Sequence, residues 1–278
     1  MMDRRLGVQL HCLRHEIARG LEPALVAIAA LGLQCVEMVS FPACRGNRWG
    51  DFGAAADRPA HELGAALRTA GLACPSTMVY GQELVAERRQ STFQWVSDLG
   101  CPRIVLTMLA TGTTPTGPPP TRSDWQRAFD EFALLAQEMR AAGLEPVVHT
   151  QPDLWRRIGD WLPADELPRR ALEGNYRVEF DPTGLMIHGG DAVASLRALG
   201  DTVYALHLRD GTPPPEPTFY IPAEPLGEGT FDWPACLAAA AAVQPWQFLE
   251  MEVRDPAQTW SALRSSLDYL RRLALVTH

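Results

Sequence analysis

The 278-residue chain predicts an α/β fold, a single (β/α)8 TIM barrel. Its length suits one barrel of this kind, which usually takes roughly 250 residues. Short apolar runs alternate strictly with amphipathic stretches, eight times in all. Such alternation favours a parallel sheet with helical crossovers, and eight units favour closure into a barrel. The stretches ALGLQCVE, TAGLACPS and AAGLEPVV repeat one pattern: each contains the end of a helix, then a glycine that stops the helix, then the start of a strand.

The expected elements follow from these alternating runs. Strands are expected over residues 6–10, 34–39, 72–79, 103–108, 145–150, 177–181, 203–208 and 247–253. Helices are expected over residues 16–30, 59–70, 82–99, 123–142, 152–172, 191–199, 231–242 and 256–273. Ser123 suits the N-cap of its helix and Gly143 its stop. No shift in composition marks a second domain, so we expect one domain over residues 1–278.

Two long loops interrupt the regular alternation, at residues 111–122 and 211–229. Both follow a predicted strand, so both are expected on the face where barrels carry their sites. We expect the first, TGTTPTGPPPTR, to be a disordered insertion. The second contains the large side chains of Phe219, Tyr220 and Ile221, which can pack against the barrel. We therefore expect it to form an ordered wall beside the site.

Composition excludes several classes of function. The net charge is -8 and the sequence pI about 5.4, which does not suit binding to a nucleic acid backbone. All 25 residues counted as Lys or Arg are arginines. Schiff-base chemistry and a phosphate-binding loop that needs lysine are therefore excluded.

Cysteine usage and apolar runs indicate the compartment. None of the six cysteines forms a CxxC pair, which favours buried apolar thiols in a reducing environment. The first residues lack the apolar stretch of a signal peptide, and no run approaches the roughly 20 residues of a membrane span. We expect a cytoplasmic protein that does not bind membranes.

Polar side chains gather where the predicted strands end. In a barrel, the carboxyl ends of the strands build the site. His149, Asp181, His207 and Glu250 end four consecutive strands, and all four are metal-ligand types. Such a mixed nitrogen and oxygen set suits Mn²⁺, Co²⁺, Zn²⁺ or Mg²⁺. A single histidine at a strand end is more often simply hydrogen-bonded, but four candidates on adjacent strands favour a metal site.

Several segments resemble the sugar phosphate isomerase/epimerase family, whose barrels are xylose isomerase-like. The resemblance spans nearly the whole chain and is most specific in strands seven and eight. The segments are LGVQLHCLR, EFDPTGLMIHGGDAV, ALHLRD, PLGEG followed by FDWPACL, and PWQFLEMEV. The resemblance implies a divalent metal held by one residue from each of strands five to eight, here His149, Asp181, His207 and Glu250.

The sequence also departs from that family's pattern. Many members have glutamate where this chain has His149, although inosose-dehydratase-like members are similar to it there. The strand-six DxxH becomes Asp181 to Gly184, so a substrate-contacting histidine is missing, and the strand-seven lysine becomes Arg209. Of the two metal-bound glutamates that the epimerases use, only Glu250 remains.

These departures shape the expected chemistry. Proton abstraction beside a carbonyl, through a metal-stabilised enediolate, needs one base. We expect Glu250 to be that base, with His149 or Glu252 as the partner acid. A symmetric two-carboxylate epimerisation is disfavoured, whereas isomerisation and dehydration remain open.

Four further residues are expected to contact a small sugar or keto-polyol: His11, Glu37, Gln151 and Arg209. The alternative for Glu37 is a purely structural role, held by an arginine or a backbone N–H. Arg209 is also expected to pair with Asp210 and so brace His207.

The sequence bears on three possible functions. The first is a divalent-metal-dependent isomerase or epimerase acting on a sugar, with a dehydratase as the alternative chemistry on the same site. The second is a metal-free sugar-binding barrel. An endonuclease-like barrel is disfavoured, because it needs a multi-zinc cluster and this chain has only seven histidines. Family resemblance also implies a homodimer.

Overall fold

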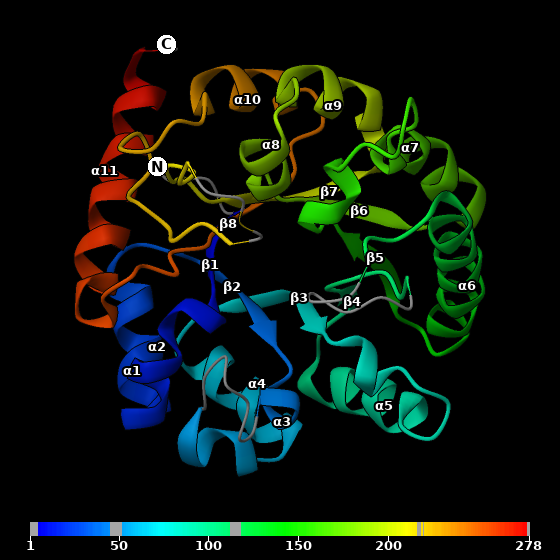
Figure 1. Cartoon of the computed structure of the whole chain (residues 1–278). Helices are drawn as coiled ribbons and strands as arrows, with labels where there is room; N and C mark the ends of the chain where they lie inside the picture. The colour runs from blue at the N-terminus through cyan, green and yellow to red at the C-terminus, as the bar shows by residue number, and fades with distance from the viewer. Residues whose placement is uncertain (1–4, 45–51, 112–117, 216–217, 219, 277–278) are drawn as a thin grey trace.

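Eight parallel strands close into one barrel, in the order β1-β2-β3-β4-β5-β6-β7-β8, with β1 also paired to β8. The computed structural model describes residues 5–44, 52–111, 118–215, 218 and 220–276, and side chains as far as 273. This arrangement confirms the predicted fold (Figure 1). The strands are β1 Leu6–Gln9, β2 Cys35–Val39, β3 Ala73–Val79, β4 Arg103–Leu106, β5 Glu145–His149, β6 Arg177–Phe180, β7 Val203–Leu208 and β8 Trp246–Leu249.

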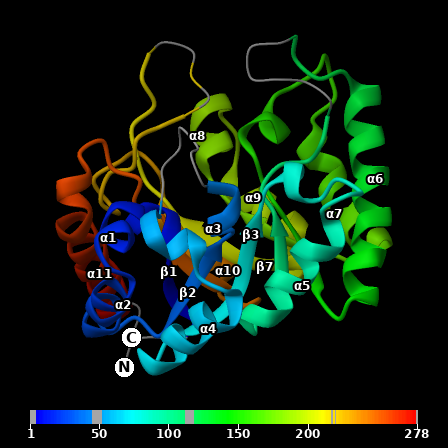
Figure 2. The same cartoon turned by 90° about the horizontal axis from the view of Figure 1, so that it is seen from below.

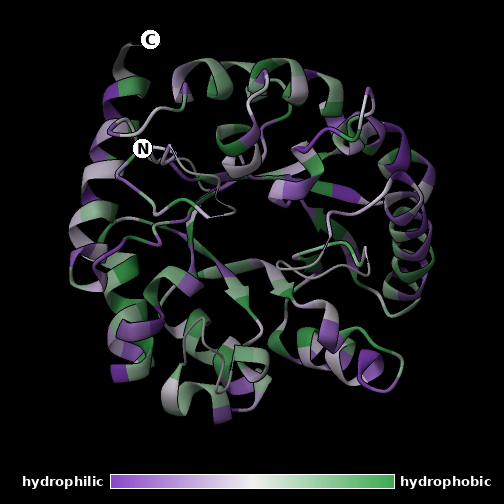
Figure 3. Cartoon of the chain, viewed as in Figure 1, coloured by the Kyte–Doolittle hydropathy of each residue, from purple (hydrophilic) through white to green (hydrophobic). Residues whose placement is uncertain are grey.

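Helices form a ring around the strands (Figure 1). Their bounds are α1 Arg14–Arg19, α2 Leu21–Ala30, α3 Phe41–Cys44, α4 Ala60–Thr69, α5 Arg89–Leu99, α6 Arg122–Ala141, α7 Pro163–Gly174, α8 Thr183–His188, α9 Ala192–Leu199, α10 Trp233–Ala240 and α11 Thr259–Val276. Hydrophobic and hydrophilic stretches alternate along this ring in Figure 3, as expected of amphipathic helices that cover a barrel. Every residue of β2 and of β7 is buried, because both faces of a parallel sheet are covered.

Several element boundaries differ from the predicted ones. The helix expected over 16–30 is two helices that meet at Gly20. The helix expected over 82–99 begins only at Arg89. The segment expected to be helical over 152–172 divides into a short 3-10 turn, Pro152–Trp155, and α7. Strand eight ends at Leu249, so Glu250 and Glu252 follow the strand instead of lying within it.

The start and the end of α6 show how local chemistry sets a helix boundary. Thr121, and not Ser123, is the N-cap, because its hydroxyl accepts the N–H of Asp124 while the Asp124 carboxylate accepts the N–H of Thr121. Gly143 follows the helix with φ of 80°, a left-handed conformation that glycine adopts without strain, so the predicted stop is correct.

The segments after β4 and after β7 rise on the same side of the barrel (Figure 2). In the segment after β7, Ile221 is fully buried, and the Tyr220 hydroxyl donates to the backbone oxygen of Glu252. This described part forms the ordered wall that was predicted, while Phe219 lies outside the described residues. The predicted disorder of the loop at 111–122 is wrong for its end, because Thr121 caps α6 and Arg122 begins it, while residues 112–117 lie outside the described residues. Among the described helices, none is both long and apolar enough to cross a membrane.

Candidate metal centre

The carboxyl ends of β5 to β8 bring together the four residues expected to bind a metal. His149 is the last residue of β5, Asp181 directly follows β6, His207 lies in β7 and Glu250 directly follows β8. Because neighbouring strands are parallel, their carboxyl ends meet at one rim of the barrel. We call these four residues the ligand cradle.

Atoms of the ligand cradle have the spacing of ligands around one ion. Nδ1 of His207 lies 3.2 Å from Oε2 of Glu250 and 3.5 Å from Oδ2 of Asp181. The same Asp181 oxygen lies 3.5 Å from Nε2 of His149. Metal bonds of about 2.1 Å place neighbouring ligand atoms roughly 3.0 to 3.4 Å apart in octahedral or tetrahedral geometry. Nδ1 of His207 is buried without a hydrogen bond, so the cradle fits a divalent ion.

Glu37 lies behind His207, on the side away from the cradle. Its Oε2 is 2.7 Å from Nε2 of His207, and its Oε1 accepts a hydrogen bond of 2.7 Å from the Ser76 hydroxyl. Since Nε2 is engaged here, Nδ1 is the nitrogen presented to the cradle. Glu37 is fully buried, a placement that favours holding His207 over contact with a sugar. Its neighbours are therefore a serine and a histidine, and not the arginine or backbone N–H of the alternative.

Arg209 braces Glu250. One guanidinium nitrogen donates to Oε1 of Glu250 at 2.6 Å, and the other donates to the backbone oxygen of Ile221 at 2.5 Å. The guanidinium also lies over the ring of Tyr220. The expected ion pair with Asp210 is wrong, because the Asp210 carboxylate instead accepts backbone N–H groups, among them those of residues 211, 227 and 231.

The other two residues expected to contact a substrate have different surroundings. Gln151 is buried, and its side-chain oxygen accepts the N–H of Leu109, which ties the segment after β5 to the one after β4. His11 is partly exposed, with Nδ1 at 3.7 Å from a carboxylate oxygen of Glu252. Arg14 lies 3.3 Å from the same oxygen. His11 and Glu252 are thus neighbours at the partly exposed edge of the site.

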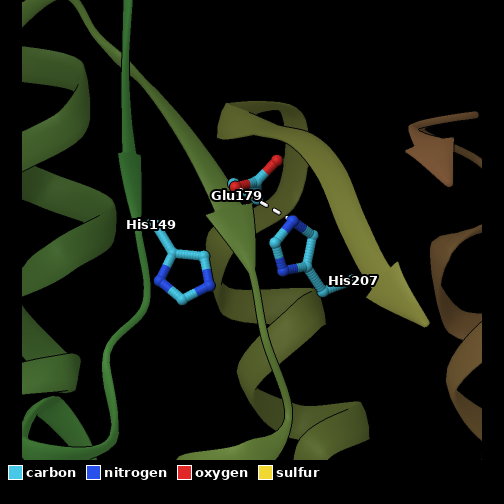
Figure 4. A group of neighbouring side chains, drawn as sticks. All are labelled: His149, Glu179 and His207. Atoms are coloured by element: carbon cyan, nitrogen blue, oxygen red, sulfur yellow. Dashed lines mark ion pairs between the residues drawn. The ribbon is translucent and has the colours of Figure 1, made fainter. Parts of the chain in front are cut away.

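Glu179 belongs to this cluster, although it was not among the predicted site residues. It is fully buried in β6, and its Oε2 lies 3.2 Å from Nε2 of His207. In Figure 4 the rings of His149 and His207 flank the strand that carries Glu179. A signal was present in the sequence: residues two apart on a strand face the same side, so Glu179 shares a side with Asp181.

Burial and charge set the acidities of these carboxyls. Burial, with the charge of Glu179, raises the pKa of Glu37 to about 8. Burial also raises the pKa of Glu252, helped by the charge of Glu250. For Glu250, burial would raise the pKa, but the charges of Arg209 and His207 outweigh it and the pKa is lowered. The site therefore contains carboxyls of contrasting acidity, as acid and base catalysis requires.

Gly184 stands where the family pattern of strand six has a histidine, and the indole of Trp155 leaves no room for a side chain there. A Cβ atom at this position would lie 1.9 Å from Cδ1 of Trp155. Trp155 comes from the turn after β5 and packs edge-on against Phe180. The indole thus occupies the space that a larger side chain at position 184 would need.

Solved structures with the same fold include several enzymes. A sugar phosphate isomerase/epimerase from Parabacteroides distasonis superposes with a TM-score of 0.72 at 15% identity, over 95% of this chain and 92% of that one. D-psicose 3-epimerase from Clostridium cellulolyticum gives 0.66 at 14% identity, over 96% and 98%. The probable 3-DHS dehydratase of Bacillus anthracis gives 0.70 at 12% identity, over 96% and 98%. At these identities the likeness concerns the fold alone.

At the level of sequence, no curated protein matches the chain. Residues 25–273, most of the chain, match the family described as xylose isomerase-like TIM barrel. That match agrees with the closed eight-stranded barrel and with the resemblance of its strand-end segments. The chain belongs to the xylose isomerase-like TIM barrel family.

Proposed function

We propose that this protein is a divalent-metal-dependent isomerase or epimerase that acts on a small sugar or keto-polyol. The observation that carries the proposal is the spacing of the ligand cradle, 3.2 to 3.5 Å between atoms of four metal-ligand side chains. His149, Asp181, His207 and Glu250 would hold the ion. Structures of similar fold include D-psicose 3-epimerases solved with D-fructose and with D-tagatose, which supports a ketose as the kind of substrate.

A divalent ion in the cradle would polarise a substrate carbonyl and stabilise the enediolate that forms when a neighbouring carbon loses its proton. Glu250 is the proposed base, because Arg209 and the other members of the cradle hold its carboxylate at the site in the charged form. Such a positioned base contributes typically 10²–10⁴-fold.

Glu252 is the proposed partner acid, in preference to His149. Nε2 of His149 faces Asp181 within the cradle, so this nitrogen is used there. Glu252 lies outside the cradle, next to His11 and Arg14, and its raised pKa favours the protonated form that an acid needs. Transfer of a proton to the former carbonyl carbon, with loss of the proton of the neighbouring hydroxyl, then completes an isomerisation. Return of a proton to the first carbon from the opposite face completes an epimerisation.

Dehydration is the second candidate, favoured by the change on strand five. With His149 in place of a glutamate, the cradle contains one glutamate only, so a two-glutamate epimerisation lacks one of its groups. A single base that removes a proton and an acid that protonates a leaving hydroxyl suffice for elimination. The similar fold of a probable dehydratase supports this alternative.

Metal content and solvent exchange together test the proposal. We expect the purified protein to bind about one Mn²⁺ or Co²⁺, and the His207→Ala, Glu250→Ala double variant to bind none. A double variant of the same composition on the exposed surface of α4, His61→Ala with Glu62→Ala, serves as the control and should bind as the wild type does.

Incubation of the protein with ketoses in D₂O then distinguishes isomerisation or epimerisation from dehydration. Isomerisation or epimerisation introduces deuterium into a substrate that keeps its oxygen count, whereas dehydration gives a product lighter by one water. If the native protein binds neither ion, the metal-dependent proposal fails and a metal-free sugar-binding barrel becomes the better explanation.

A further inference from the structure

Glu179 is a buried carboxylate without a hydrogen-bonding partner. It is fully buried, and neither of its oxygens makes a hydrogen bond among the residues that the structure describes. The nearest cationic atom is Nε2 of His207, at 3.2 Å, but this nitrogen already bonds to Glu37 at 2.7 Å. One ring nitrogen therefore faces two carboxylates, which we call the Glu37–Glu179 pair.

Such a group is costly unless positive charge lies nearby. A carboxylate taken out of water loses strong hydration, and proteins keep one only beside a compensating partner or ion. Ligand-type atoms of His149, Glu179 and His207 all lie within 4.8 Å of one another. Both imidazoles are members of the ligand cradle, so an ion bound there would add positive charge close to Glu179.

The charge of the cradle gives Glu179 a reason to be present. The cradle contains two carboxylates, Asp181 and Glu250, because strand five contributes the neutral ligand His149. Glu179, next to Glu37, places a further carboxylate on the far side of His207 from Glu250. Carboxylates behind ligating histidines orient the ring and raise its basicity, and their removal typically weakens metal binding 10–100-fold.

We propose that Glu179 is a positioning residue of the metal centre. It pairs with the imidazole of His207 at Nε2 and supplies the negative charge that strand five lacks. It acts through the two histidines and touches neither ion nor substrate. This inference rests on the proposed function, because it assumes that a divalent ion binds in the cradle.

Binding of Co²⁺ to the full-length protein tests it. Glu179→Gln keeps the shape and removes the charge. We expect its Co²⁺ affinity, measured by competition with a chelator, to fall 10–100-fold. The visible absorption bands of the bound Co²⁺ should keep the wild-type pattern, because the four ligands are unchanged. Glu179→Asp keeps the charge, and its affinity should stay within a few-fold of the wild type.

Glu83→Gln is the matched control. Glu83 is also a buried glutamate, but its partners are the Ser40 hydroxyl and the N–H of Tyr80, away from the cradle. This variant should bind Co²⁺ as the wild type does, so a loss confined to Glu179→Gln cannot come from burying an amide as such. Should Glu179→Gln fail to fold, Glu179→Ala, which also removes the charge, takes its place beside Glu83→Ala.

Three outcomes separate the possibilities. Equal Co²⁺ affinity of Glu179→Gln and wild type overturns the inference and leaves the proposed function intact. Altered Co²⁺ bands in Glu179→Gln also overturn it, because Glu179 is then itself a ligand. Absence of Co²⁺ binding by the wild-type protein contradicts the proposed function, and with it the basis of the inference.

Discussion

Nε2 of His207 lies 2.7 Å from the carboxylate of Glu37, across a separation of 170 residues in the chain. This contact fixes the ring so that Nδ1 faces Asp181 and Glu250. Orientation of a ligating histidine by a carboxylate on its other nitrogen is a recurrent feature of metal sites. The contact therefore links a residue at the centre of the barrel to the geometry of the rim.

Replacing Glu37 by glutamine tests this link. We expect Co²⁺ affinity to fall roughly 10–100-fold, because the ring of His207 loses the group that orients it. Since Glu37 and Glu179 hold the same imidazole, the losses in Glu37→Gln and Glu179→Gln should not add in the double variant. Chelator competition measures all three affinities. Strictly additive losses would show that the two carboxylates act independently.

Removing Arg209 should destabilise the protein. Arg209→Met removes the guanidinium from the partly buried carboxylate of Glu250, and breaking such a pair costs up to about 3–5 kcal/mol, the value for a fully buried one. Saturating Co²⁺ should recover part of that loss, because the ion replaces the missing positive charge. Denaturant unfolding with and without Co²⁺ measures both effects. Arg169→Met, which breaks only ion pairs of an exposed arginine, should leave stability nearly unchanged.

Gly184 should tolerate no side chain while Trp155 is present. We expect Gly184→Ala to lower the free energy of unfolding by about 1–3 kcal/mol, because the new methyl group collides with the indole. Adding Trp155→Ala should make the Gly184 substitution nearly neutral in that background. Gly81→Ala is the control, because nothing lies within 4 Å of a Cβ there. An equal cost in both backgrounds would mean that Trp155 is not the obstacle.

Metal affinity should fall as the pH falls. Burial alone would lower the pKa of His207, but the charge of Glu179 and the nearby carboxylate of Asp181 outweigh it and raise that pKa well above its usual value. In the metal-free protein the ring is therefore protonated near neutral pH, and an ion must displace its proton. We expect weaker Co²⁺ binding at about pH 6 than at about pH 8, with proton release on binding. Calorimetry in buffers of different ionisation enthalpy measures the release, and pH-independent affinity would contradict this assignment.

The fold was predictable from the sequence because the strand and helix signals are local. The apolar run 203–208 coincides with β7, and Gly143 ends α6 as expected. The helix expected over 16–30 was wrong because Gly20 interrupts a continuous apolar pattern. A pattern of hydrophobicity alone does not register such an interruption.

The sequence predicted those residues of the candidate site that stand at the ends of strands, but not the side chains that contact them. The four cradle residues could be named from the strand ends, but their partners lie on other strands. Arg209 and Asp210 are neighbours in the chain just after β7, yet the Arg209 guanidinium meets Glu250 while the Asp210 carboxylate accepts backbone N–H groups. Glu179 was missed because its proposed role depends on Glu37 and His207, which only the closed barrel brings near it.

A crystal soaked in Co²⁺ and measured at the cobalt absorption edge tests the central claim most directly. Our account predicts a single anomalous peak in the cradle, about 2.1 Å from Nε2 of His149, Oδ2 of Asp181, Nδ1 of His207 and Oε2 of Glu250. A crystal without a peak at this position, or with the ion bound only elsewhere, would contradict it.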